Sequence, residues 1–162
     1  MRNEAADELR DEVSGALPTL GLLSEKEAAT PPAPGRWSPK QIIGHLVDSA
    51  FTNHGRFVRA QGQDDLVFPG YAQDRWVEAQ RYQDRSWREL VRLWEHVNLH
   101  LAWVMESAPA SERTRPRRTH NLHEIGFRPV PPAEPATLEQ LMLDYVEHLR
   151  HHLRQVRECA KT

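Results

Sequence analysis

Two histidines four residues apart, His148 and His152, are the residues whose spacing points most directly to chemistry. On an α-helix, residues at this spacing are offset by only about 40°, so both imidazoles project from one face, one turn apart. Tyr145 and Leu149 make the same face apolar. Two neutral imidazoles in this arrangement can bind one divalent metal ion, because each supplies a nitrogen lone pair. The alternative for such a pair is an ordinary helix surface without a ligand.

His45 is the candidate for a third ligand. It lies near the start of an expected helix, beside Ile42, Leu46 and Ser49 on the stripe predicted to face inward. A lone histidine on such a stripe is more often a core residue bonded to a carbonyl group, so both interpretations stay open. Three imidazoles without a fourth protein ligand would leave coordination positions free, which is typical of a catalytic metal site.

Three charged residues could assist this site. Asp144 precedes the histidine pair by one turn and could accept the other ring N–H of its first member, as carboxylates beside metal-binding histidines do. Asp48 and Arg56 follow the candidate third ligand by three and eleven residues, spacings that place them near the same helix face. Arg56, or the neighbouring Arg59, could hold the carboxylate of a bound small molecule. For Asp48 and Arg56 the alternative is a surface salt bridge.

Other histidines are weaker candidates. His96 and His100 are also four residues apart, but they flank the apolar stripe of their helix and fit an exposed surface better. His120 and His123 fall in a long connection where nothing in the sequence fixes their geometry, and His54 lies about 180° from the candidate third ligand. The sequence has no paired cysteines, HExxH pattern, phosphate-binding glycine loop or nucleophile elbow, which excludes the best-marked chemistries.

Four helices are expected to position these residues. Apolar residues recur at intervals of three and four over about 5–23, 38–62, 86–109 and 137–160, and a short helical turn is expected near 74–82. Each of the last three long helices begins with a capping box, formed by Ser38 and Gln41, Ser86 and Glu89, and Thr137 and Gln140. No alternating pattern is long enough to predict a strand. Helices of about 20 residues are near 30 Å long and would pack as an all-α four-helix bundle.

Length and composition exclude several classes of protein. The 162 residues fit a single domain spanning 1–162, and a net charge of −2 lacks the basic footprint of a nucleic-acid-binding protein. A basic run of Arg113, Arg115, Arg117 and Arg118 is interpreted as a solvated loop within the long connection 110–136, which is expected to be functional or disordered. No stretch approaches the ~18 apolar residues of a membrane span. The single Cys159 favours a reducing cytoplasm.

Two segments resemble the DinB/YfiT-like superfamily of metal-dependent enzymes. They are Arg36-Trp-Ser-Pro-Lys-Gln-Ile-Ile-Gly-His-Leu-Val-Asp48 and Asp144-Tyr-Val-Glu-His-Leu-Arg-His-His-Leu-Arg-Gln-Val156. The likeness extends from about residue 9 to residue 156. It implies an up-up-down-down four-helix bundle with a divalent metal at one end of the core, held by His45, His148 and His152.

The resemblance also implies a use for the metal. Zn²⁺ or Ni²⁺ is expected. Members of the family often form homodimers, and characterised relatives include S-transferases and isomerases that use low-molecular-weight thiols. The expected function is transfer of such a thiol to an electrophile, or hydrolysis of a small substrate, by a cytoplasmic homodimer. The region of Trp76 and Trp87 is one place to expect the dimer interface. Two alternatives stay open: a non-catalytic, stress-associated metal-binding bundle, and a metal-free bundle whose three imidazoles lie more than ~5 Å apart.

Overall fold

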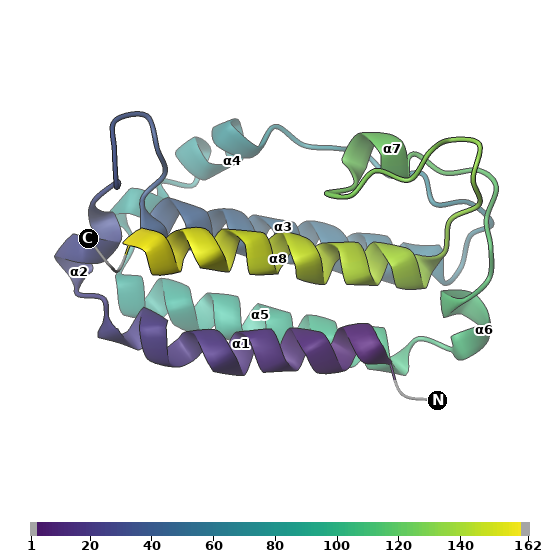
Figure 1. The fold of residues 1–162 in the computed structure, drawn as a ribbon, viewed down its shortest axis with the longest axis horizontal. Coiled ribbons are helices and arrows are strands. Elements are labelled where there is room, and N and C mark those ends of the chain that lie inside the picture. Colours follow the sequence, from purple (N-terminus) through teal and green to yellow (C-terminus); the bar gives the residue numbers. More distant parts are fainter. Residues whose placement is uncertain (1–2, 160–162) are drawn as a thin grey trace.

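Four long helices form the body of the protein in this computed structural model, which describes residues 3–159 (Figure 1). They are α1 (Glu4–Leu22), α3 (Pro39–Ala60), α5 (Trp87–Ser107) and α8 (Leu138–Cys159). Short helices occupy the connections: α2 (Glu25–Ala29), α4 (Gln73–Ala79), the 3₁₀ helix η1 (Tyr82–Asp84), α6 (Ala110–Arg113) and α7 (Leu122–Ile125). Within residues 3–159 the only β structure is two isolated bridges, so the predicted all-α class is confirmed. Ala160, the expected end of the last helix, lies outside the described residues.

Local capping interactions explain where the long helices begin. The Ser38 hydroxyl accepts the backbone N–H of Gln41, whose side chain accepts the N–H of Ser38 in return. Thr137 and Gln140 form the same reciprocal pair before α8. Ser86 accepts one N–H of the first turn of α5. These bonds satisfy amide groups that a helix start otherwise leaves unpaired.

The four long helices pack in a ring. α5 packs against α1 and α3, and α8 packs against the same two helices. α1 and α8 run in one direction and α3 and α5 in the other (Figure 1). Along the chain the order is therefore up, down, down, up; read round the ring from α8 through α1 and α5 to α3, it is the up-up-down-down arrangement implied by the resemblance. Because α3 and α5 are parallel, residues 61–86 carry the chain back along the bundle.

The core lies between the four helices. Every long helix contributes buried apolar side chains, among them Leu9, Leu20, Ile43, Leu46, Phe57, Leu90, Trp94, Leu101 and Leu153. Trp87 also belongs to this core: it is 4% exposed, and its indole N–H donates to the Leu20 carbonyl oxygen. The expectation that Trp87 helps to form a dimer interface is therefore wrong, whereas Trp76 is 42% exposed. None of the described helices is long and apolar enough to cross a membrane.

The connection 110–136 is ordered. It contains α6 and α7, a parallel bridge between Leu66 and His120, and an antiparallel bridge between Arg117 and Ala136. These bridges fasten the connection to the segment that follows α3 and to the residues just before α8. The segment therefore has a fixed course over one end of the bundle (Figure 1).

Two arginines of the basic run are buried in this connection. The guanidinium of Arg117 donates to the Ala60 carbonyl oxygen at the end of α3, at 2.8 Å, and to Glu112 at 3.1 Å. Buried Arg113 forms an ion pair with Glu139 in the first turn of α8. The interpretation of the run as a solvated loop is therefore wrong for these two residues, which bind groups at the helix ends.

Candidate metal centre

The three candidate histidines converge where α3 packs against α8. One ring nitrogen from each of His45, His148 and His152 lies within 4.8 Å of the others. The Nε2 atoms of His45 and His148 are 3.1 Å apart. Two ligand atoms, each about 2.0–2.1 Å from a tetrahedral ion, are roughly 3.3 Å apart, so this spacing fits a shared ion. The wide separation required by the metal-free alternative is not what the structure shows.

Antiparallel packing explains this convergence. α3 begins at the end of the bundle where α8 finishes, so His45 in the second turn of α3 faces the C-terminal half of α8 (Figure 1). Gly44 has its own role beside it, because an added Cβ would lie 2.2 Å from a ring carbon of Tyr82. The glycine before the histidine lets this ring pack directly against α3.

Burial keeps the three imidazoles neutral. Desolvation lowers the pKa of His45 to about 3 and that of His148 to about 2, and it also lowers the pKa of His152. Electrostatic interaction with His152 makes a smaller contribution to these low pKa values of His45 and His148. Because a metal binds the neutral form of histidine, the lone pairs are available at neutral pH without loss of a proton.

Hydrogen bonds determine which nitrogen is available in two of the rings. Gln155 Oε1 lies 2.8 Å from His152 Nδ1; since an amide oxygen can only accept, Nδ1 carries the proton and Nε2 keeps its lone pair. His148 Nδ1 lies 3.4 Å from Ser49 Oγ, which leaves Nε2 directed at His45. His45 Nδ1 is buried and has no hydrogen-bond partner. The donor set thus fits a divalent ion bound through imidazole nitrogens.

Aromatic side chains enclose the cluster. The ring of Trp37 lies 5.1 Å from that of His45, centroid to centroid, and Tyr71 stacks on the same imidazole at 6.5 Å. Phe127, from the connection 110–136, packs against His148 with centroids 5.6 Å apart. Such an apolar shell limits the access of water to a metal site. Neither Tyr71 nor Phe127 carries a periodic signal in the sequence, and sequence reasoning missed both.

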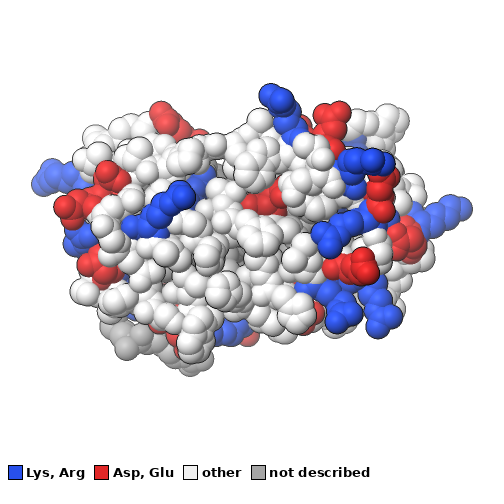
Figure 2. All heavy atoms as spheres, turned by 180° about the vertical axis from the view of Figure 1, so that it is seen from behind, with Lys and Arg blue, Asp and Glu red and all other residues white. Residues whose placement is uncertain are grey.

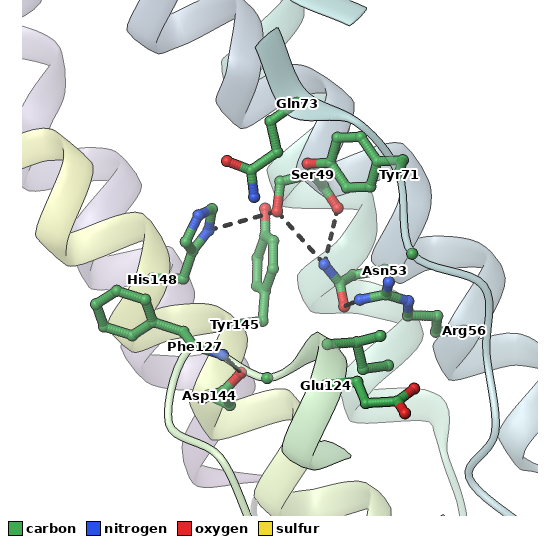
Figure 3. A pocket seen from close by; sticks show the side chains of 13 residues that line it. Ser49, Asn53, Arg56, Tyr71, Gln73, Glu124, Phe127, Asp144, Tyr145 and His148 are labelled. Carbon is green, nitrogen blue, oxygen red and sulfur yellow. Dashed lines mark hydrogen bonds between the residues drawn. The ribbon is translucent and has the colours of Figure 1, made fainter. Parts of the chain in front are cut away.

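Asp144 has partners other than the one predicted. Its two carboxylate oxygens accept the backbone N–H groups of Phe127 and Arg128 at 2.9 and 2.6 Å, and Figure 3 shows Asp144 beside Phe127. Both ring nitrogens of His148 face other residues, so the expectation that Asp144 accepts a proton from this ring is wrong. Burial raises the pKa of the Asp144 carboxyl. Its structural effect is to hold Phe127 against the histidine cluster.

Asp48 also has other partners. One carboxylate oxygen accepts hydrogen bonds from the Tyr82 hydroxyl and the Gln80 amide, both at 2.7 Å, and burial raises the pKa of this carboxyl. No hydrogen bond joins it to the three histidines among the described residues. Asp48 therefore fixes the Tyr82 ring that covers Gly44.

The remaining histidines lie outside the cluster. His96 and His100 are exposed on α5, as expected for them, and the ring of His54 lies 5.2 Å from that of His100. His120 is buried, with its Nε2 2.7 Å from the Glu134 carbonyl oxygen. This histidine therefore has a structural role in the connection 110–136.

A cavity of about 330 Å³ opens beside His148 (Figure 3). Its polar lining comes from α3, α8 and two connections, through Ser49, Asn53, Arg56, Tyr71, Gln73, Glu124, Asp144 and Tyr145. Arg56 is thus at the cavity as predicted, whereas Arg59 is exposed and does not line it. The sequence carries a signal for Ser49 and Asn53, since they continue the inward stripe of His45 at intervals of four residues.

A match to a known family covers almost the whole chain. Residues 7–156 fit the sequence pattern of the DinB superfamily. The chain belongs to the DinB superfamily. The resemblance seen in the two histidine-bearing segments is thereby confirmed.

Individual relatives of this DinB-superfamily chain carry descriptions of function. A protein of Bacillus mycoides (strain KBAB4) named "Putative metal-dependent hydrolase" is 28% identical over 72 residues, which are 44% of this chain and 40% of that protein. The match thus covers less than half of either protein. The structure of YfiT from Bacillus subtilis, titled "a probable metal-dependent hydrolase with an unusual four-helix bundle topology", aligns with a TM-score of 0.77. The alignment covers 98% of this chain and 85% of that one at 17% identity, so it shows the shared fold alone.

Proposed function

We propose that this protein is a divalent-metal-dependent enzyme acting on a small molecule, with the ion held by His45, His148 and His152. The observation that carries the proposal is the convergence of three neutral imidazoles, His45 buried and the other two partly buried, beside a polar cavity of about 330 Å³. The descriptions of the two relatives as metal-dependent hydrolases support it. Zn²⁺ and Ni²⁺ are the ions proposed, because imidazole is a good ligand for both.

The chemistry divides between the ion and the protein. A divalent ion with three protein ligands supplies Lewis acidity, which lowers the pKa of a water or thiol that reaches an open coordination position. The protein orients the ligands: Gln155 fixes the His152 ring, and Ser49 faces the other nitrogen of His148. Trp37 and Phe127 limit the entry of bulk water.

Thiol transfer to an electrophile is the reaction that we propose first. No carboxylate belongs to the histidine cluster, and Asp144 in the cavity wall already accepts two backbone N–H groups. Among residues 3–159, a strong general base is therefore lacking beside the three rings. A thiol ionises near pH 8.5, whereas water ionises near 15.7, so a thiol requires less help to become a nucleophile.

Hydrolysis is the second candidate. Glu124 lines the same cavity with an exposed carboxylate, which could accept the proton of an attacking water. The descriptions of both relatives also name hydrolysis. A non-catalytic metal-binding bundle is the third possibility, and the polar cavity adjoining the cluster argues against it.

Metal analysis tests the site itself. The protein is purified without a histidine tag, and the metal content of each preparation is measured by elemental analysis. We expect about one ion per chain in the wild type and in the control His96→Ala, which alters an exposed histidine on α5. His148→Ala should lose the ion, because two imidazoles bind more weakly than three. Equal metal content in the wild type and His148→Ala would overturn the proposed site.

An activity screen separates the two reactions. One arm offers several low-molecular-weight thiols with a chromogenic electrophile, and the other offers chromogenic esters without a thiol. Product that requires the thiol supports transfer, and product formed without it supports hydrolysis. In either case His148→Ala should lower the rate by at least on the order of 10²-fold, while His96→Ala should not. Failure of the metal-loaded protein in both arms would favour the non-catalytic alternative.

A further inference from the structure

Arg56 is a buried cation that forms no salt bridge among the described residues. Its side chain is 6% exposed, and its guanidinium donates to two neutral oxygens, at 3.0 Å on Pro69 and 3.5 Å on Asn53. Its Nε has no hydrogen-bond partner. Among residues 3–159 no carboxylate lies within salt-bridge distance of Arg56, although Asp144 in the same cavity wall acts on it electrostatically. Burying a charge without a counter-charge is strongly unfavourable, so such a group is typical of a binding site.

Other buried arginines of the same chain show the contrast. Arg113 forms an ion pair with Glu139, and Arg117 forms one with Glu112. Both therefore have a carboxylate that compensates their charge within the fold. Arg56 is also buried, but it faces the cavity beside His148 (Figure 3). The oxygens of Asp144 in the same cavity accept two backbone N–H groups, so an anion in direct contact with Arg56 would come from a molecule in that cavity.

A row of polar groups connects Arg56 to the histidine cluster. His148 Nδ1 lies 3.4 Å from Ser49 Oγ, Ser49 Oγ lies 3.4 Å from Asn53 Nδ2, and Asn53 Oδ1 lies 3.5 Å from the Arg56 guanidinium. His45 and Arg56 are eleven residues apart on α3, about 16 Å along the helix axis. Figure 3 shows His148 and Arg56 on opposite sides of the cavity. A molecule that reaches both must be elongated.

The charges around the cavity favour a single carboxylate over a phosphate. Glu124 and Asp144 line the same space as Arg56. Two negative groups facing a dianion would oppose its binding, whereas one arginine can compensate one negative charge. The planar guanidinium also matches the two oxygens of a carboxylate.

We propose that Arg56 binds a carboxylate of the substrate, at the side of the cavity opposite the metal-binding histidines. The substrate class is thus an elongated small molecule with a carboxylate at one end and its reacting group at the other. This inference rests on the proposed function for the position of the reacting group. The carboxylate site itself exists whether or not a metal is bound.

A binding experiment with acetate and inorganic phosphate tests the inference. The Nε–H resonance of Arg56 is followed by NMR in the full chain, both as purified and after treatment with a chelator. We expect acetate to shift this resonance saturably in both preparations, and phosphate at the same concentrations and pH 8 to have at least tenfold lower affinity. No saturable shift with acetate, or tighter binding of phosphate, would overturn the carboxylate site.

Variants locate the binding. Arg56→Met should weaken acetate binding at least tenfold in the chelator-treated protein, and Arg59→Met, which alters an exposed arginine on the same helix, should leave it unchanged. Arg56→Lys retains a positive charge and should weaken it less than Arg56→Met. Equal affinity in the wild type and Arg56→Met would contradict the proposal. If Arg56→Met does not fold, the wild-type resonance and Arg56→Lys decide the question.

Metal content separates the two proposals. Arg56→Met should retain the metal content of the wild type, because Arg56 is not a ligand. Absence of metal from the wild type would refute the metal site but leave the acetate titration informative. Normal metal content without acetate binding would refute only the carboxylate site.

Discussion

At the scale of single residues, the position of His45 depends on the packing of its neighbours. Gly44 presents bare backbone to the ring of Tyr82, and the hydroxyl of that tyrosine donates to Asp48. The Tyr82 ring therefore contacts α3 at two positions, one residue before His45 and three residues after it. The glycine beside this candidate metal ligand is thus explained by the space that the Tyr82 ring requires, and not by the metal.

Replacing Gly44 tests this packing. Gly44→Ala should lower the free energy of unfolding by about 1–3 kcal/mol, because the new methyl group would overlap the Tyr82 ring. The matched control is Gly55→Ala on the same helix, where nothing lies within 4 Å of the added Cβ. That change should be neutral or stabilising by up to about 1 kcal/mol. Urea unfolding measures both, and equal stability of the two variants would contradict the steric explanation.

At the scale of elements, one end of the bundle is held together by arginines of the connection 110–136. Arg117 binds the last carbonyl of α3, and Arg113 binds a carboxylate in the first turn of α8. The end of α3 and the start of α8 are thereby fixed at the same end of the bundle. This matters for the site, because His45 and His148 meet only if α3 and α8 keep their relative positions.

Removing one of these contacts should destabilise the bundle. Arg117→Met deletes hydrogen bonds from a charged donor to Ala60 and Glu112, so we expect a loss of roughly 2–3 kcal/mol in the free energy of unfolding. Arg118→Met alters an exposed arginine of the same run and should change it by less than about 0.5 kcal/mol. Chemical denaturation followed by circular dichroism makes the comparison. Similar losses in the two variants would mean that burial of Arg117 has no special role.

At the scale of the whole molecule, the outer face of α3 and α5 is unusually apolar. Four side chains on it are 40–63% exposed: Phe51 and Val58 on α3, and Leu99 and Trp103 on α5. Figure 2, which views the molecule from the side of these helices, shows mainly uncharged side chains in the middle and charged ones toward both ends. A face whose middle is mainly uncharged and apolar can pack against an identical copy of itself about a twofold axis.

We therefore expect a homodimer that forms through this face. Analytical ultracentrifugation should show a dimer for the wild type and a monomer for Trp103→Glu, since a buried, unpaired carboxylate would disrupt the interface. Trp76→Glu introduces the same charge at another exposed tryptophan and should remain dimeric. A monomeric wild type would refute the homodimer, and a monomeric Trp76→Glu with a dimeric Trp103→Glu would move the interface to the region of Trp76.

Local patterns were sufficient to predict the helices and half of the site. Capping pairs such as Ser38 with Gln41, and apolar residues three and four apart, depend only on neighbours within one turn. The sequence therefore determined four long helices, the shared face of His148 and His152, and the inward stripe that carries His45. The family resemblance supplied the link between the two segments.

Contacts between distant segments were decided by the tertiary structure alone. His45 meets His148 because α3 and α8 pack antiparallel across 103 positions of sequence, which no local spacing encodes. The burial of Arg117, the partners of Asp144 and the covering of the cluster by Phe127 depend on the course of the connection 110–136. An irregular connection has no repeating pattern, so its contacts are set by what it packs against and become visible only in the folded chain.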